Sequence, residues 1–163
     1  MKKDKFYFME IAIEQAIIAR ENGEVPVGAI VVLNEKVVGR GYNSVIENRD
    51  PTAHAEIVAI RDAGKKLKNY RLIGAEMYVS LEPCLMCYSA MVNARIKKLY
   101  YSAFDLKGGI FSTKKFLQVA NTYNHYIKVE GGILKDQSSR LLKTFFKVRR
   151  DAGAVERDGL ENR

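Results

Sequence analysis

The chain has 163 residues, 47% of them hydrophobic, which is enough for one compact domain with a core and too little for two. Its net charge of +8 fits a polyanionic partner, although many basic proteins bind no nucleic acid. The sequence contains no run of eighteen apolar residues and no secretory signal pattern, so neither a membrane span nor secretion is expected. The two cysteines stand in a Cys-x-x-Cys spacing, which favours a metal or redox pair in the reducing cytoplasm over a disulfide framework.

The first third of the chain predicts a helix followed by a pair of strands. Apolar residues recur at helical spacing over 4–22, and this amphipathic helix should end near Gly23 and cover a sheet. Residues 27–33 are nearly all apolar and predict a buried strand. After a polar turn at 34–36, the chain resumes at Val37 as the second strand of the pair.

The middle of the chain alternates helices and strands. A helix is expected over 53–67 with Thr52 as its N-cap, then a strand over 77–81. A helix over 83–93 with the proline in its first turn and a strand over 96–101 follow. Strands that are separated by helices need crossover connections, so the later part of the sheet should be parallel. The predicted fold class is α/β, as a three-layer α/β/α domain.

The C-terminal part is less regular. A short helix is expected over 113–120, a last strand over 126–129, and a final helix over 134–150. Residues 151–163 mix charges with few apolar groups and are expected to form a disordered tail. Residues 1–150 are therefore predicted to form a single domain.

Two short motifs carry the chemistry, His-Ala-Glu at 54–56 and Pro-Cys-x-x-Cys at 83–87. A catalytic Zn²⁺ keeps three protein ligands and one open position for water, and His54, Cys84 and Cys87 supply that number. Cysteines three residues apart on the first turn of a helix can share a metal, and the helix N-terminus favours their thiolate forms. Water held by such a metal loses its proton far more readily than bulk water.

Glu56 lies two residues after His54, about 200° around a regular helix, so it is not expected to bind the same ion. It is free to take a proton from water, protonate a ring nitrogen and protonate a leaving amine. A Cys-x-x-Cys pair alone fits a redox pair or two buried thiols equally well, and a lone histidine is more often structural. All four residues together favour a catalytic zinc site. The combination of His-x-Glu with Pro-Cys-x-x-Cys also resembles the signature of zinc-dependent nucleobase deaminases, which implies hydrolytic deamination with Glu56 as the proton shuttle.

Longer blocks make the chain similar to the bacterial tRNA-specific adenosine deaminase family from the first helix to about residue 150. These blocks are EVPVGA at 24–29, DPTAHAE at 50–56, NYRL at 69–72, LEPCLMC at 81–87 and FFKVRR at 145–150. The resemblance implies a cytidine deaminase-like fold with a five-stranded mixed sheet, one Zn²⁺ per subunit and a homodimer. It also implies hydrolysis of adenosine to inosine at the wobble position of a tRNA anticodon stem-loop, in a tRNA for arginine.

The resemblance assigns substrate contacts as well. Asn43, at the end of the second predicted strand, matches a base-contacting asparagine, whereas a turn residue is the alternative. Val27 matches an apolar pocket position, although a valine in a strand belongs to the core by default. The RNA contacts implied on the terminal helix are Phe145, Lys147, Arg149 and Arg150. From the residues alone, a solvated amphipathic helix with its phenylalanines in the core is the better interpretation of that segment.

The loop 105–112 departs from the family pattern, with bulky Ile110 and Phe111, and Ser102 stands where glycine is common. These differences are expected to reshape the RNA-facing or dimer surface without touching the metal site. A histidine at 125 matches a position that the family places near the RNA, and a loop histidine without a role is the alternative.

Two other functions stay open. One is a zinc-dependent deaminase of a free base or nucleoside, such as guanine, cytosine or cytidine, which the basic terminal helix disfavours. The other is an inactive zinc module that only binds RNA or a partner, which Glu56 disfavours.

Overall fold

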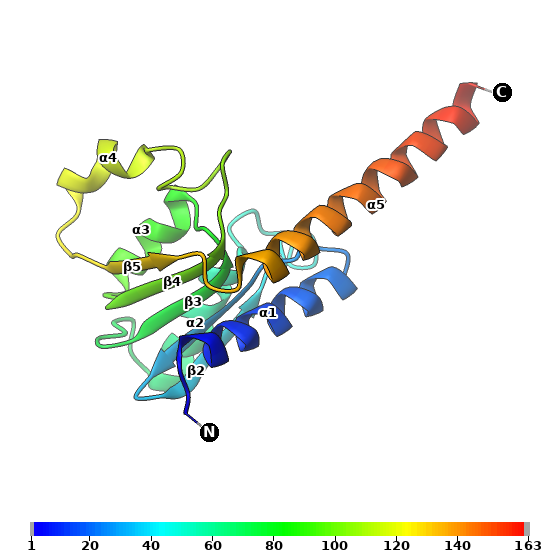
Figure 1. Cartoon of the computed structure of the whole chain (residues 1–163). Helices are drawn as coiled ribbons and strands as arrows, with labels where there is room; N and C mark the ends of the chain where they lie inside the picture. Colours follow the sequence, from blue (N-terminus) through cyan, green and yellow to red (C-terminus); the bar gives the residue numbers. More distant parts are fainter. Residues whose placement is uncertain (1, 162–163) are drawn as a thin grey trace.

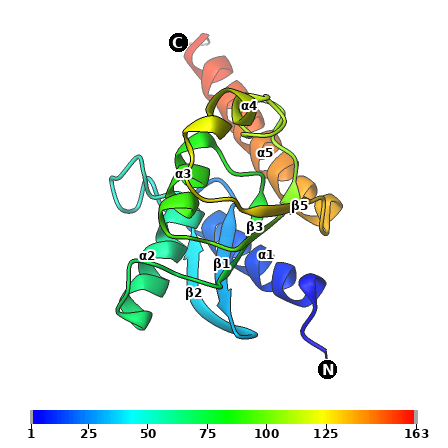
Figure 2. The same ribbon diagram turned by 90° about the vertical axis from the view of Figure 1, so that its left-hand side faces the viewer.

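A five-stranded sheet runs through the middle of the molecule, and helices cover both of its faces (Figures 1 and 2). The computed structural model describes residues 2–161, and side chains for 2–153. Its elements are α1 (Lys5–Glu21), β1 (Gly28–Leu33), β2 (Lys36–Tyr42), α2 (Ala55–Leu67), β3 (Glu76–Leu81), α3 (Leu85–Asn93), β4 (Lys98–Ala103), α4 (Lys115–Val119), the 3₁₀ helix η1 (Ala120–Thr122), β5 (Lys128–Gly131) and α5 (Lys135–Glu161). The predicted three-layer α/β/α fold with a five-stranded mixed sheet is confirmed.

The sheet has the strand order β2-β1-β3-β4-β5. Strand β1 pairs antiparallel with both β2 and β3, whereas β3, β4 and β5 are parallel to one another. This register brings the start of β1 and the carboxyl ends of β2, β3 and β4 to one edge of the sheet. Residues that leave these strand ends therefore meet there, as they do at the ligand-binding edge of other open α/β sheets.

Strand β1, an internal strand of the sheet, is apolar along its whole length. Ala29 and Val31 belong to the core between the sheet and the helices α2 and α3. Ile30 and Val32 belong to the core on the opposite face, under α1. Figure 2 shows α1 and α5 on one side of the sheet and α2 and α3 on the other. Both faces of the strand are covered, so both sets of side chains must be apolar.

Two predicted helix starts are wrong by about two residues. The N-cap of α2 is His54 rather than Thr52, because the Thr52 hydroxyl donates to Asp50 in the preceding turn and is not available to cap a helix. The N-cap of α3 is Cys84, so Pro83 precedes the helix instead of lying in its first turn. Both corrections place an expected metal ligand at an N-cap.

Helix α5 extends past the expected end at residue 150 and stays helical to Glu161. Its distal half projects away from the sheet (Figure 1). The division into a domain over 1–150 and a tail over 151–163 stays a prediction, and residues 162 and 163 of that tail lie outside the described residues. In the described part of the chain, no helix combines the length and hydrophobicity that a membrane span needs.

Helix α2 packs directly on the backbone of β2. A Cβ atom at Gly41 would lie 2.3 Å from the carbonyl oxygen of Ala55, the first residue of α2. The missing side chain at Gly41 therefore allows the close approach that sets where α2 begins. Because His54 and Glu56 flank Ala55, this contact also sets the position of the chemistry-bearing residues.

Gly41→Ala is expected to lower the free energy of unfolding by about 1–3 kcal/mol, because backbone must move to admit the methyl group. Thermal or urea unfolding measures this change. Gly64→Ala, within α2, is the control, since its methyl meets no atom closer than 3.4 Å. The control is expected to be neutral or stabilising by under about 1 kcal/mol. Equal destabilisation by both changes would contradict the close-packing argument.

Candidate active site

Three side chains form a compact group of metal-binding atoms. His54 Nδ1 lies 3.7 Å from Cys84 Sγ and 3.4 Å from Cys87 Sγ, and the ligand atoms lie within 4.8 Å of one another. Zinc bonds of about 2.0 Å to nitrogen and 2.3 Å to sulfur in a tetrahedron would separate neighbouring N and S atoms by about 3.5 Å. The observed spacing and the imidazole and thiolate donors therefore fit Zn²⁺.

The N-termini of two helices converge to build this group. His54 and Cys84 are the N-cap residues of α2 and α3, and Cys87 lies one turn into α3. Unpaired backbone N–H groups at helix starts carry partial positive charge, which favours the thiolate form that a metal needs. The fold thus delivers the donors from two separate crossover segments to one edge of the sheet.

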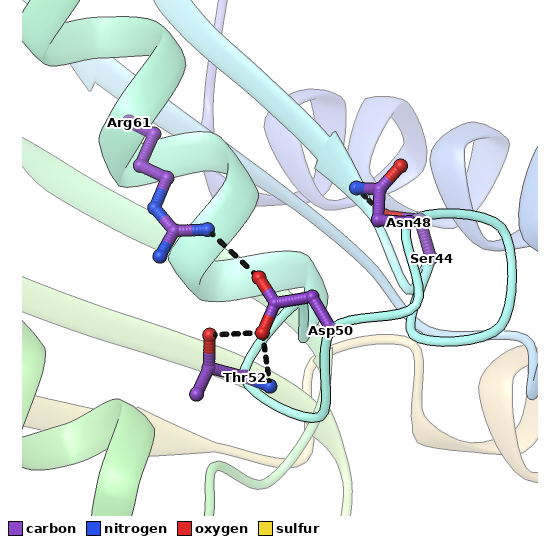
Figure 3. A network of polar contacts seen from close by, with 5 residues as sticks. All are labelled: Ser44, Asn48, Asp50, Thr52 and Arg61. Atoms are coloured by element: carbon purple, nitrogen blue, oxygen red, sulfur yellow. Dashed lines mark hydrogen bonds and ion pairs between the residues drawn. The ribbon is translucent and has the colours of Figure 1, made fainter.

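A polar network shapes the loop that leads into α2 (Figure 3). The backbone N–H and hydroxyl of Thr52 donate to Asp50 Oδ1 at 2.9 and 2.7 Å, and Arg61 on α2 lies 3.4 Å from Asp50 Oδ2. The Thr52 bonds and the Arg61 charge hold the pKa of Asp50 below its usual value. Farther up the loop, Asn48 donates to Ser44 Oγ at 3.2 Å. The contact between Asp50 and Arg61 therefore ties the segment before His54 to helix α2.

Without metal, protons are unevenly distributed over the three donors. Hydrogen bonds from Cys87 and His54 lower the pKa of Cys84 to about 4. The hydrogen bond to Cys84 raises the pKa of His54, and the contact with the Cys84 thiolate, together with burial, raises the pKa of Cys87. Protons therefore compete with zinc more strongly at His54 and Cys87 than at Cys84.

Zinc affinity is expected to rise as the pH increases, because zinc competes with protons for His54 and Cys87, whose pKa values are both raised. Competition with a chromophoric chelator measures the affinity, and calorimetry in buffers of different ionisation enthalpy counts the protons released. Cys84→Ser serves as a ligand-deficient control. An affinity that does not change with pH would contradict this distribution of protons.

Glu56 lies beside the metal-binding group in an enclosed position. Its side chain is 4% exposed, and it lines a cavity of about 320 Å³ together with His54 and Cys84. It is not one of the three clustered donors, as the sequence predicts. Burial raises the pKa of Glu56 to about 7, so the carboxyl group can hold or release a proton near neutral pH. We call this space the active-site cavity.

Asn43 and Val27 line the same cavity. The Asn43 side-chain N–H donates to the Val25 carbonyl oxygen at 3.3 Å, while its buried Oδ1 has no hydrogen-bond partner among the described residues. An unpaired buried acceptor costs about 1–3 kcal/mol, a cost that a ligand's donor group can remove. The structure thus places both residues in the cavity that His54, Glu56 and Cys84 also line, and their contact with a substrate stays a prediction.

A second, larger hollow of about 880 Å³ adjoins the active-site cavity and shares Val25, Leu81 and Asp105 with it. It lies between α5 and the loop after β4. Its other lining residues are Phe104, Leu106, Lys107, Leu142, Lys143, Phe146, Arg149, Arg150 and Gly153. We call it the α5 groove. Its mixture of cations and aromatic rings suits phosphates and unstacked bases.

Of the four residues on α5 that were predicted to contact RNA, two line the α5 groove and two do not. Arg149 and Arg150 line the α5 groove, as expected. Phe145 is buried, with the Arg149 guanidinium 5.1 Å from its ring centre, so core packing holds for this residue. Lys147 is exposed but is not among the lining residues. Phe146 lines the groove instead, and its helical spacing from Arg149 and Arg150 was the signal that could have identified it.

The structure also places His125 and the loop 105–112, which the sequence analysis singled out. His125 Nε2 lies 2.7 Å from the Ile96 carbonyl oxygen, which fits a structural role. The loop 105–112 lies closer to the metal site than expected, because the Ile110 N–H donates to the carbonyl of Pro83, the residue before Cys84. Sequence reasoning also missed Glu82, which is 2% exposed and lines the active-site cavity.

Comparison with known proteins fits this fold and this site. Residues 2–103 match the family model described as the cytidine and deoxycytidylate deaminase zinc-binding region. The fold, the His-Cys-Cys group and this match define a zinc-dependent deaminase, and zinc is its cofactor.

The relatives narrow this class. A tRNA-specific adenosine deaminase from Buchnera aphidicola is 47% identical over 88% of this chain and 95% of its own length. A solved structure from a study of A-to-I editing by tRNA:A34 deaminases at the wobble position is 44% identical, with a TM-score of 0.81, and covers 85% of this chain and all of that one. The chain belongs to the tRNA-specific adenosine deaminase family.

A guanine deaminase from Bacillus subtilis resembles the chain less. It is 34% identical, with a TM-score of 0.60, over 69% of each chain. The same zinc-deaminase architecture therefore also serves an enzyme named for a free base, so the substrate must be argued from the surroundings of the metal.

Proposed function

We propose that this protein hydrolyses the adenosine at the wobble position of a tRNA anticodon to inosine and releases ammonia. The observation that carries the proposal is the junction of two spaces. A cavity lined by two of the metal donors and a buried carboxyl group adjoins a basic, aromatic groove on α5, with which it shares three lining residues. The cavity, of about 320 Å³, can hold one base, and the cations and aromatic rings of the groove can bind the RNA on either side of that base. The named activity of the relatives supports the same substrate.

For the metal, we assign His54, Cys84 and Cys87 as the three protein ligands. Zn²⁺ supplies the positive charge that makes water acidic enough to attack a purine ring at neutral pH. The neighbouring helix starts and the network around Asp50 hold these donors in place before the metal arrives.

Glu56 carries the proton transfers. Its carboxylate accepts a proton from the water that attacks C6 of the adenine, then protonates the adjacent ring nitrogen. Glu56 then takes the second proton of the same water, now on the oxygen bound to C6, and passes it to the amino group. The amine leaves as ammonia, and the oxygen stays on C6 as the carbonyl of inosine. The burial of Glu56 excludes bulk water that would compete as a proton donor, and its pKa of about 7 matches both the accepting and the donating steps.

The substrate base enters the cavity in a fixed orientation. The unpaired Oδ1 of Asn43 accepts a hydrogen bond from a base N–H, and Val27 contacts the apolar face of the ring. A base must leave its stack to reach this cavity, which costs a few kcal/mol in a duplex and less in a loop. This difference favours an anticodon loop.

The RNA backbone follows the α5 groove. Arg149 and Arg150 neutralise phosphates, and the 45%-exposed Phe146 offers a ring for stacking. The Phe145 ring packs against the Arg149 guanidinium and so orients it. The exposed Lys147 adds positive charge on the same helix. These assignments combine the residues implied by the family with the positions that the structure gives them.

We further propose an arginine tRNA as the substrate, a homodimer as the working form and the cytoplasm as the location. The family resemblance supports the first two. The two free cysteines and a tRNA substrate support a reducing compartment that contains tRNA. Light scattering of the purified protein measures the oligomeric state directly.

Zinc-loaded wild-type protein is expected to convert the wobble adenosine of an unmodified arginine tRNA, and Glu56→Gln is expected to lower turnover about a hundredfold or more. Glutamine keeps the size of the side chain but cannot move protons, so zinc content and RNA binding should not change. Reverse transcription and sequencing detect inosine as A-to-G reads. Metal analysis and a binding assay provide the controls.

The alternative substrate class is tested in the same experiment. If the zinc-loaded wild type leaves the tRNA unchanged but deaminates guanine, cytosine or cytidine, the free-base alternative replaces the proposal. If Glu56→Gln turns over at the wild-type rate, Glu56 has no part in the proton transfers.

Arg149→Ala combined with Arg150→Ala is expected to weaken binding of the anticodon stem-loop and to reduce the salt dependence of the affinity. Each phosphate contact contributes a slope of about 0.7 in log K against log salt for a single strand, so the slope should fall by about 1.4. Lys36→Ala in β2 combined with Lys65→Ala in the last turn of α2 removes the same charge away from the groove. A similar loss of slope in this control would mean that net charge, and not the groove, attracts the RNA.

A further inference from the structure

Glu82 directly follows β3 in the chain. Its buried carboxylate accepts hydrogen bonds from a single loop that is distant in the sequence. Oε1 accepts from the Asp105 N–H at 3.3 Å and from the Ser112 hydroxyl. Oε2 accepts from the N–H groups of Phe111 and Ser112 at 3.1 and 2.9 Å. With 2% of the side chain exposed, both oxygens are shielded from solvent. All of these donors belong to the loop 105–112.

The loop is shaped around this carboxylate. A Cβ atom at Gly109 would lie 1.9 Å from Glu82 Oε2, so only glycine allows the backbone to pass this closely. The next residue, Ile110, is fully buried and donates its N–H to the Pro83 carbonyl at 2.9 Å. The loop is therefore fastened to the segment that also carries Cys84.

The fastened loop forms a wall of two spaces. Its first residue, Asp105, lines both the active-site cavity and the α5 groove, and Leu106 and Lys107 line the groove. Glu82 itself lines the cavity. A shift of this loop would change the passage between the place of the base and the place of the RNA strand. None of the three metal donors, His54, Cys84 and Cys87, belongs to the loop itself.

We propose that Glu82 is a positioning residue for the RNA substrate. Its carboxylate holds the loop 105–112 as the wall shared by the active-site cavity and the α5 groove, and so prepares the entrance through which the base passes. The proposal rests on the proposed function for its substrate. It assigns Glu82 no contact with the reacting atoms and no part in metal binding.

Glu82→Gln tests the proposal with little change in shape. One carboxylate oxygen becomes an NH₂ group, which faces donors instead of accepting from them, so at most one of the two oxygen positions keeps its bonds. Hydrogen exchange at the Phe111 and Ser112 amides should become faster. KM for an anticodon stem-loop should rise about tenfold, while kcat stays within about twofold, because a binding wall is lost and the proton-transfer group is intact.

Two variants complete the experiment. Glu130→Gln makes the same chemical change at a surface glutamate that pairs with Lys5, and it should change neither the exchange rates nor KM. Ser112→Ala removes a single hydroxyl donor and should produce a smaller rise in KM. Combined with Glu82→Gln, it should add less than its separate effect, because the two groups share one interaction. Ser112→Ala also keeps the proposal testable if Glu82→Gln does not fold.

The outcomes separate this proposal from the proposed function. Unchanged loop exchange, or an unchanged KM with a lower melting temperature only, would overturn it in favour of a purely structural role. Loss of zinc or a collapse of kcat would overturn it in favour of a role in the metal site. If the wild type does not act on RNA, the proposed function fails, and with it the RNA part of this inference, whereas faster amide exchange in Glu82→Gln still identifies the anchor.

Discussion

The convergence of two helix N-termini is the constraint on which the rest of this structure depends. The three donor atoms must lie within 4.8 Å of one another, yet they come from helices that follow different strands. The β1-β3 and β3-β4 registers bring the relevant strand ends to one edge, and the bare Gly41 backbone lets α2 settle against β2. The core packing on this face of the sheet therefore fixes the donor geometry as well as the stability of the domain.

Carboxylates hold the loops around this edge. Asp50 organises the turn before α2, and Glu82 anchors the loop after β4. The third is Glu24, 1% exposed, whose carboxylate accepts from the N–H groups of Ile46 and Glu47 in the loop after Asn43. Charged acceptors form stronger hydrogen bonds with backbone N–H groups than neutral ones do. Flexible connections are thereby held firmly enough to line a cavity.

The sequence could reveal the elements and the metal donors because both depend on local patterns, namely apolar periodicity and motif spacing. It misplaced the start of α2, because the side chain of Thr52 bonds Asp50 rather than the helix. It chose Phe145 over Phe146, since which face of α5 meets the body is decided by tertiary packing. It missed Glu82 because the donors to that carboxylate lie 23–30 residues away in the chain.

The distribution of charge sorts the parts of a nucleic acid between the two spaces. Cations on α5, including Arg149 and Arg150, attract phosphates to the groove, in keeping with the net charge of +8. The active-site cavity instead carries the carboxyl groups of Glu56 and Glu82, which disfavour a phosphate and admit a neutral base, and Asp105 lies at the boundary of the two spaces. A polynucleotide that lies in the groove is thus directed to present a base, and not its backbone, to the metal donors.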